Sequence, residues 1–274
     1  MGLRINTNVA SLNAQRNLAR TSLALGRTLE RLSSGLRINR AADDPAGLAI
    51  SEGLRARIRS MQQAERNALD GISMVQVGEG ALAETANLLI RMRELAVHAA
   101  NGTLSDSDRS SLTEEFQASR DEIDRIAAVT DFGGVPLLDG GAAIYLQIGV
   151  LAGEGITVSG VDARADALGL TGLGVSSATF AQGSLSGLDD AIRSVASLRA
   201  RFGTAQNRIE SAIRTLRIGI EATSAAESRI RDADLAYEVS QLSRHQVLLE
   251  YGASVLAQAN LSPAIALQLL PLPA

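Results

Sequence analysis

The sequence contains no cysteine, no tryptophan and no lysine, and aromatic residues make up only 3% of its 274 residues. Without cysteine, the chain can form neither a disulfide framework nor a thiolate metal site or nucleophile. Its 26 basic residues are all arginine and are outnumbered by 30 acidic residues, so the formal net charge of -4 argues against nucleic acid as a partner. The start, MGLRINTNVASLNAQRN, lacks the apolar run of a secretory signal peptide. We therefore expect that any export uses another route.

The apolar residues, 46% of the chain, are mainly Leu, Ile, Val and Ala, a composition typical of helix seams. One seam repeats in steps of four and three residues through Leu54, Ile58, Met61, Ala68, Ile72, Val75, Leu82, Ala86, Leu89 and Ala96. Only Glu65, Glu79 and Arg93 interrupt it. A helix from Asp44 to about His98 would be roughly 80 Å long. A compact globule of this chain length would be about 50 Å across, so the pattern predicts a rod.

A second seam lies near the other end of the chain, and it too is broken by a few polar residues. It runs through Leu188, Ile192, Val195, Phe202, Ile209, Ile213, Leu216, Ile220 and Ile230. Two such seams predict an antiparallel coiled coil, and a third helix is expected from about Ser107 to Ala128. Residues 132–183 alternate around glycine-rich turns and predict a small β-hairpin region. The predicted fold is therefore mainly α: a long antiparallel coiled-coil bundle with a small β-hairpin region and paired N- and C-terminal helices.

The two terminal segments, Leu3 to Leu32 and Leu235 to Leu270, carry apolar faces that the seams do not use. The residues that we predict to drive polymerisation are Ile5, Val9, Leu12, Leu235, Val239, Leu242, Leu249 and Leu256. Polar residues and a proline cut the uncharged run 251–274 well short of the roughly 20 apolar residues that a membrane span requires. We therefore expect no membrane span, and other copies of the chain or a partner to cover these faces.

The stretch LSSGLRINRAADDPAGLAI, residues 32–50, interrupts the helical pattern. Gly35 is expected to end the first helix, Asp43 or Asp44 to cap the next, and Pro45 to lie in its first turn. We interpret this stretch as a hinge, or spoke, between two helical segments, with the chain near 229–238 crossing back beside it. An ordinary helix–helix loop is the alternative.

Long blocks at both ends of the chain resemble bacterial flagellin. The N-terminal blocks include RINTNVASLNAQRNL, LERLSSGLRINRAADDPAGLAIS and RMRELAVHAANGT. The C-terminal blocks include GTAQNRIESAI and AAESRIRDADLAYEVSQLSRHQVLLEYGASVLAQAN. The resemblance implies a structural subunit of the flagellar filament, which polymerises into a helical tube for swimming. Residues 1–42 and 234–274 would form the inner terminal-helix domain, and residues 43–233 the outer helical bundle. With only a short β-rich segment between the helices, this would be a minimal flagellin.

The resemblance also implies partners and a location. It implies an extracellular protein of the flagellum, exported by the flagellar type III channel without a cleaved signal peptide. Expected partners are a flagellar secretion chaperone, the filament cap and the hook-junction proteins. A vertebrate Toll-like receptor is a further expected partner, and the positions that match its contact motif are Arg91, Leu95 and Glu115. A hook–filament junction protein or a minor specialised filament subunit is the alternative function.

An enzyme is the competing class, because some flagellins carry a metalloprotease insert. The two histidines, His98 and His245, are isolated, and no HExxH motif occurs. We therefore expect no catalytic residue, no metal and no cofactor.

Overall fold

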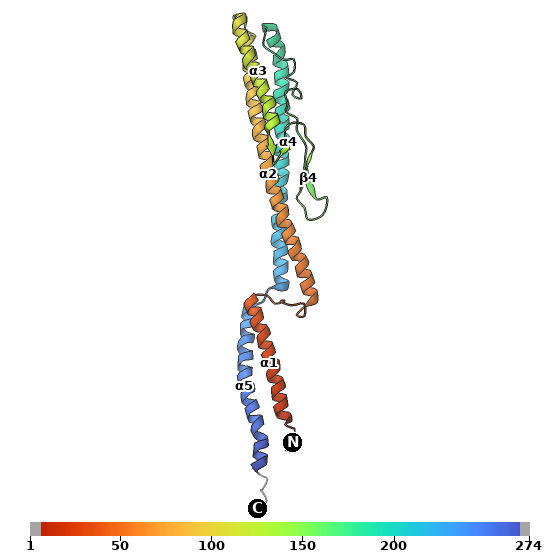
Figure 1. The fold of residues 1–274 in the computed structure, drawn as a ribbon, viewed down its shortest axis with the longest axis vertical. Coiled ribbons are helices and arrows are strands. Elements are labelled where there is room, and N and C mark those ends of the chain that lie inside the picture. The colour runs from red at the N-terminus through yellow and green to blue at the C-terminus, as the bar shows by residue number, and fades with distance from the viewer. Residues whose placement is uncertain (1–6, 269–274) are drawn as a thin grey trace, which may run out of the picture. The chain divides into compact units, whose positions relative to one another are not determined.

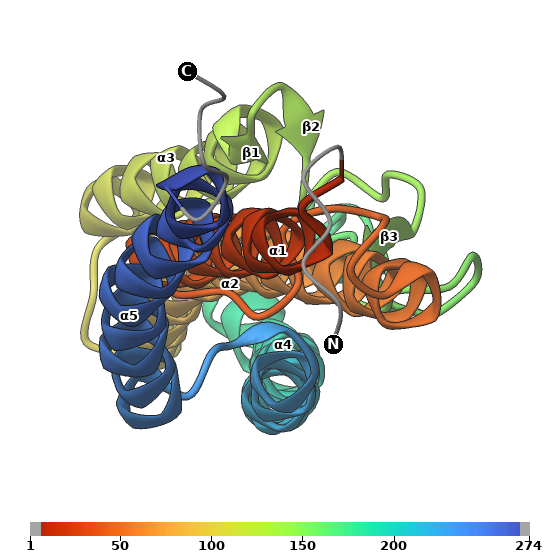
Figure 2. The same ribbon diagram turned by 90° about the horizontal axis from the view of Figure 1, so that it is seen from below.

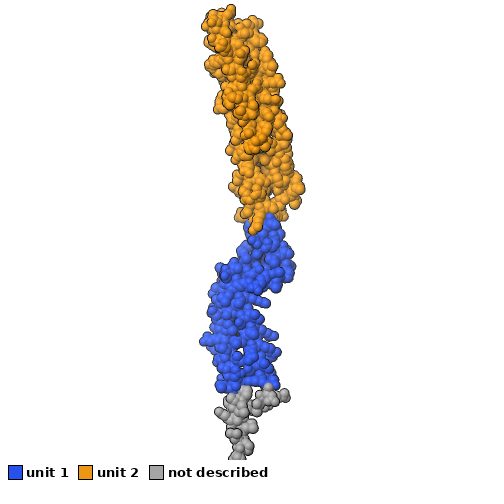
Figure 3. All heavy atoms as spheres, in the orientation of Figure 1, with its two compact units in different colours: residues 1–56, 222–274 blue, residues 57–221 orange. Residues whose placement is uncertain are grey.

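The computed structural model of the protein describes residues 7–268, in which five helices and two small sheets form (Figure 1). The helices are α1 (Val9–Ser34), α2 (Pro45–Ala99), α3 (Asp106–Val129), α4 (Ala178–Arg231) and α5 (Leu235–Gln268). The chain divides into two compact units, residues 1–56 with 222–274 and residues 57–221 (Figure 3). The predicted mainly α class is confirmed.

Two antiparallel strand pairs follow α3. The strand β1 (Asp131–Phe132) pairs with β2 (Val135–Pro136), and β3 (Ile144–Gln147) pairs with β4 (Gly155–Val158). The helix α4 already begins at Ala178, inside the segment 132–183 that we expected to be β-rich. Ser177 explains this early start, because its hydroxyl accepts a hydrogen bond from the Phe180 amide at 3.2 Å, as an N-cap does.

The helix α1 begins later than the sequence suggested. The Asn8 side chain accepts a hydrogen bond from the Ser11 amide at 3.0 Å and caps the helix, so Val9 is its first residue rather than Leu3. The start of α3 is fixed by a capping box, in which Ser105 and Asp108 each accept a hydrogen bond from the other's backbone amide.

Both predicted seams lie inward, as expected for a coiled coil. All ten seam residues of α2 and all nine of α4 are buried or half-buried. Most of the buried ones belong to one hydrophobic core in the unit 57–221, which also takes Phe116 and Ile123 from α3 and Leu138 and Leu170 from the segments between α3 and α4. This unit therefore has an ordinary apolar core of its own.

The polar residues that interrupt the α2 seam each form an ion pair with α4. The Arg217 guanidinium lies 2.7 Å from Glu65, and that of Arg199 lies 2.7 Å from Glu79. At the third break the charges are exchanged, because Arg93 donates to Asp189 at 2.7 Å. The pairs join positions that rise along α2 to positions that fall along α4, so the two helices are antiparallel. The polar residues that interrupt the α2 seam are therefore contacts between α2 and α4.

The helices α2 and α4 approach closely where Phe202 meets Gly78. A Cβ atom added to Gly78 would lie 3.0 Å from two ring carbons of Phe202. The ring itself is buried, with 3% of its surface exposed. A glycine in the middle of a helix costs about 1 kcal/mol of stability relative to alanine. At position 78 the burial of the Phe202 ring in the space that glycine leaves offsets this cost.

The turn between α2 and α3 is held by a buried arginine. Arg109 donates hydrogen bonds to the backbone oxygens of Ala99, Asn101 and Leu104, at 3.2, 2.9 and 2.9 Å. Only 8% of Arg109 is exposed. One side chain therefore satisfies three carbonyl groups at the end of a helix and in the turn that follows it.

We expect Arg109→Ala to lower the free energy of unfolding by about 2–3 kcal/mol, because it leaves these carbonyls without a protein donor. Urea denaturation followed by circular dichroism measures this loss. The matched control is Arg125→Ala in the same helix, whose side chain is exposed and forms an ion pair with Glu122. Equal stability of the two variants would contradict this role for Arg109.

Candidate assembly site

The terminal helices α1 and α5 lie side by side (Figures 1 and 2). Their contact is partly polar. The Asn8 side-chain amide donates to the carbonyl of Ala259 at 2.7 Å, and the Ser11 hydroxyl donates to the Asn260 side chain at 2.8 Å. Further along the pair, Arg31 lies 3.1 Å from Glu238. These contacts fix which faces of the two helices meet.

The contact between α1 and α5 is loosely packed. A cavity of about 410 Å³ lies between them, lined by Arg20, Arg27, Gln241 and His245 among others. The Nδ1 atom of His245 is buried there without a hydrogen-bond partner in the part of the chain that the structure describes. In the unit 1–56 with 222–274, Ile38 is the one fully buried hydrophobic residue among those described. This unit therefore has almost no apolar core.

Helix α5 presents apolar side chains in nearly every direction. Of the residues that we predicted on it, Leu242, Leu249 and Leu256 are half-buried and share a side of the helix with Glu238, whereas Leu235 and Val239 are exposed. A separate stripe on another side is also exposed. Its residues are Tyr237, Leu248, Tyr251 and Val255, with Arg244 between them. Apolar side chains on more than one side of a helix are normally buried, and α1 alone does not cover those of α5.

Helix α1 divides its apolar residues in the same way. Leu18, Leu25 and Leu32 are half-buried, and a Cβ atom on Gly252 of α5 would lie 3.0 Å from Leu18. Val9 and Leu12 are half or more exposed, at 56% and 50%. Ile5, which we predicted to continue this stripe, lies outside the described residues.

The connector between α1 and α2, residues 35–44, pairs with the end of α4. Gly35 ends α1 in the left-handed conformation, with φ of 69°. Its carbonyl then accepts from the Ala233 amide at 2.9 Å, and the Arg37 amide donates to the carbonyl of Arg231 at 2.6 Å. Ile38, 1% exposed, anchors the connector. The sequence indicated that the chain crosses back here, but it did not single out Ile38, one of two large apolar residues in the connector with Leu36.

The two aspartates of the connector have different partners. Asp44 precedes Pro45, the first residue of α2, and accepts from the Gly47 amide at 2.9 Å in the manner of an N-cap. Asp43 instead accepts from the amides of Arg40 and Asn39, and chiefly the Arg40 hydrogen bond lowers the pKa of the Asp43 carboxyl. The connector is thus tied both to α2 and to itself.

A second tie joins the start of α2 to the end of α4. Arg231 donates to Glu52 at 2.6 Å, and this hydrogen bond is the main cause of the lowered pKa of the Glu52 carboxyl. Arg55, one turn further along α2, contacts the same carboxylate at 3.1 Å. The Glu52–Arg231 ion pair could not be foreseen from the sequence, because it depends on how the chain crosses back, whereas Glu52 and Arg55 are three residues apart on one helix.

The three positions matching the receptor motif lie where α2 and α3 meet, but they do not share one surface. Arg91 is exposed and pairs with Glu115 of α3 at 2.7 Å and with Glu94 at 3.1 Å. The hydrogen bond that Arg91 donates to Glu115 is the main cause of the raised pKa of Arg91. Leu95, in contrast, is buried with 3% exposed. In this structure the exposed part of the motif is therefore the Arg91–Glu115 ion pair.

Among the residues that the structure describes, no group of three or more metal-ligand side chains lies together. His98 lies exposed in the last turn of α2, and His245 lies at the α1–α5 cavity. No described helix combines the length and apolar character needed to cross a membrane. The exposed apolar side chains of α1 and α5 form the candidate site, and such a surface is typical of a structural protein that assembles through helix packing.

Comparisons with known proteins agree with this class. The bacterial flagellin N-terminal helical region matches residues 5–143, and the bacterial flagellin C-terminal helical region matches residues 185–270. The flagellin of Halalkalibacterium halodurans is 43% identical, with 97% of this chain and 99% of that protein covered. The flagellin of Bacillus subtilis is 41% identical, with 98% and 100% covered. In the crystal structure of Bacillus cereus flagellin, 34% identical, the match has a TM-score of 0.52 and covers 55% of this chain and 88% of that one.

The chain belongs to the bacterial flagellin family. It is a structural subunit of the extracellular flagellar filament and not an enzyme. The chain has 274 residues, and its alignment with the flagellin of Halalkalibacterium halodurans covers nearly all of both proteins, so the two are of similar, short length. The minimal form that we predicted is therefore confirmed.

Proposed function

We propose that polymerisation is driven by burial of the exposed apolar faces of α1 and α5 against other copies of this chain. The residues in this role are Val9, Leu12, Leu235 and Val239, together with Leu242, Leu249 and Leu256 at the edge of the α1 contact. Ile5 extends this set by its sequence alone. Residues 1–42 and 234–274 would then form the inner part of the filament, and residues 43–233 the outer part.

The observation that carries this proposal is that α5 keeps exposed apolar side chains on more than one side, although it packs along α1, whose own Val9 and Leu12 are also exposed. Fully burying one Val or Leu side chain is worth about 1.5–3 kcal/mol. An isolated pair of helices without an apolar core is marginally stable in water. Contact with further copies supplies the missing burial, and contacts that repeat without closing a ring produce a filament.

In this arrangement the connector, with Gly35, Asp43, Asp44 and Pro45, acts as the spoke between the inner and outer parts. Its backbone pairing with residues 231–233 and the Glu52–Arg231 ion pair support that role. The alternative, an ordinary loop between two helices, would not require these ties to a segment almost two hundred residues away.

The proposal is tested by seeded polymerisation of the full chain and of a chain lacking residues 240–274, each imaged by electron microscopy. We expect tubular filaments from the full chain only. Circular dichroism should show that the shortened chain keeps the helices of the unit 57–221. If the shortened chain also forms filaments, the terminal helices do not drive assembly. Short rings from the full chain would instead favour a hook–filament junction protein.

Assembly of this kind also requires that the apolar faces be covered before export. We therefore propose a secretion chaperone that covers α5, export without a cleaved signal peptide, and contacts with the filament cap and the hook-junction proteins. The exposed face of Tyr237, Leu248, Tyr251 and Val255 is the surface best suited to such a chaperone.

A vertebrate Toll-like receptor is the remaining proposed partner. The Arg91–Glu115 ion pair supplies two charged groups on an exposed surface. Leu95, being buried, would support this surface from below rather than contact the receptor through its side chain.

A further inference from the structure

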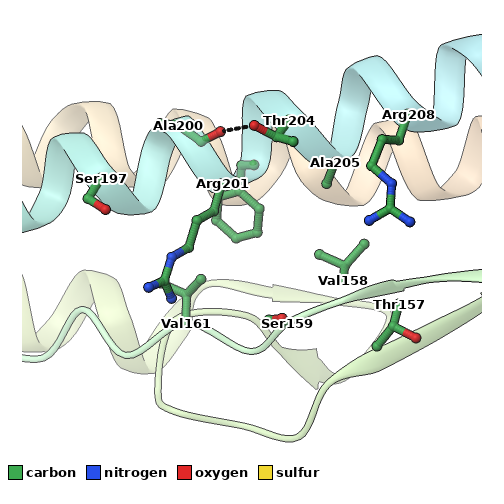
Figure 4. Close-up of a pocket in the computed structure, with 11 residues that line it drawn as sticks. Thr157, Val158, Ser159, Val161, Ser197, Ala200, Arg201, Thr204, Ala205 and Arg208 are labelled. Atoms are coloured by element: carbon green, nitrogen blue, oxygen red, sulfur yellow. Dashed lines mark hydrogen bonds between the residues drawn. The ribbon is translucent and has the colours of Figure 1, made fainter.

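A hollow in the unit 57–221 carries two arginines that the fold itself does not use. It has a volume of about 400 Å³ and lies between α4 and residues 157–161. Arg201 and Arg208 extend from α4 toward this segment, and Ser197 and Thr204 lie on the same helix (Figure 4). Thr157 and Ser159 line the opposite side, with Val158 and Val161. The helix therefore presents two long cationic side chains among short hydroxyl side chains, which leave room for an approaching surface.

Both arginines lack a carboxylate partner. Neither forms an ion pair with any residue that the structure describes, although most other arginines of α4 do, including Arg193, Arg199, Arg217 and Arg231. Both residues are exposed. An acidic protein with two uncompensated arginines at one hollow favours a partner that brings negative charge to this place.

The spacing of the arginines limits what that partner can be. They are seven residues apart, so their positions on α4 are separated by about 10.5 Å along one side of the helix. Two carboxylates seven residues apart on a facing helix match this spacing. Helix α3 has three such pairs, but Asp108 and Glu115 are used in the capping box and by Arg91, and Glu115 and Glu122 by Arg91 and Arg125. The third pair is Glu114 and Asp121.

Glu114 and Asp121 are both exposed. Glu114 has no ion pair among the described residues, and Asp121 has only a contact of 3.4 Å with its neighbour Arg120. Gln117 and Ala118, which lie between them on the same side of α3, are also exposed and carry no charge. This side of α3 is therefore a surface with two available carboxylates at the spacing of the arginines.

We propose that the hollow at Arg201 and Arg208 receives the Glu114–Asp121 side of α3 from a second copy of this chain. The inference rests on the proposed polymerisation and names one contact of the outer helices within it. The two surfaces are different, so each copy can offer its α3 to one neighbour and its hollow to another. Such a heterologous contact continues from copy to copy, as a filament requires.

Exchanging the charges tests the contact. Arg201→Glu with Arg208→Glu places four acidic groups together, and we expect the critical concentration for assembly to rise about tenfold or more. Adding Glu114→Arg and Asp121→Arg restores opposite charges with the two sides exchanged, and we expect the critical concentration to return to within about threefold of the original chain. Sedimentation of filaments measures the critical concentration, and thermal unfolding shows that each variant is folded.

A matched control separates the contact from net charge. Asp70→Arg with Glu84→Arg restores the same net charge by changing two exposed acidic residues of α2, and we expect it not to rescue the charge-reversed chain. Rescue by both pairs of substitutions, or by neither, would overturn the inference, as would normal assembly of the charge-reversed chain. If the unaltered chain forms no filaments, the proposed function itself fails, which distinguishes the two results.

Discussion

Replacing Val255 with aspartate is expected to prevent filament formation while leaving the unfolding of the monomer unchanged. The Val255 side chain is 58% exposed in the single chain and belongs to the outward apolar stripe of α5. An exposed substitution of this kind changes monomer stability by about 0.5 kcal/mol or less. In the assembled state the same position would be covered, and an unpaired carboxylate placed there costs several kcal/mol. Since about 1.4 kcal/mol is a factor of ten, the critical concentration should rise at least about 100-fold.

Two controls accompany this measurement. Val255→Ile keeps the apolar surface and should assemble at a concentration close to that of the original chain. Ser240→Asp adds the same charge at an exposed polar position of α5 and should have a much smaller effect. The prediction is wrong if Val255→Asp assembles normally, or if its monomer melts at a clearly lower temperature, because the residue would then act in folding.

The largest expected loss of stability comes from Phe202→Ala. Phe202 fills the space that Gly78 leaves on α2, and truncating a buried phenylalanine costs about 3–5 kcal/mol. Phe180→Ala is the matched control, because that phenylalanine lies in the same helix but is 46% exposed. We expect it to change the free energy of unfolding by less than about 1 kcal/mol. Urea denaturation of the two variants measures the difference.

The close approach of Gly78 and Phe202 makes a sharper test possible. Gly78→Ala adds helix propensity worth about 1 kcal/mol, but its new Cβ lies 3.0 Å from the ring. The same substitution should therefore be more favourable in a Phe202→Ala chain than in the original one. Additive effects of the two substitutions would show that the glycine is not there to accommodate the ring.

The sequence predicted the helices well because their apolar residues recur with one period over many turns. Leu82, Leu89 and Val195 are examples of seam positions that the structure buries. The helix starts were less predictable, since Asn8 and Ser177 each act through a single hydrogen bond to the backbone that periodicity does not reveal. Short caps of this kind decide where α1 and α4 begin.

Pairings between distant residues could not be predicted at all. In the sequence, Glu79 is only a polar interruption of an apolar seam. Its ion pair with Arg199, 120 residues away, is visible only in the structure. Leu95 likewise belongs to the family motif by its identity, but only the packing of α2 and α3 shows that its side chain is buried. The assembly surface could likewise be predicted only in part. The stripe with Leu235 and Leu242 was visible in the sequence, but the division into half-buried and exposed residues depends on where α1 lies.

The ion pairs that interrupt the α2 seam also guard against misalignment during folding. Leucine-rich helices pack almost equally well after sliding by whole heptads, so apolar contacts alone leave the alignment ambiguous. Because Arg93–Asp189 has its charges exchanged relative to Glu79–Arg199, a slide of two heptads in one direction would place Glu79 beside Asp189. A slide in the other direction would bring Arg93 close to Arg199. Like charges would then meet at either misalignment, so this single exchange favours one alignment of the two long helices.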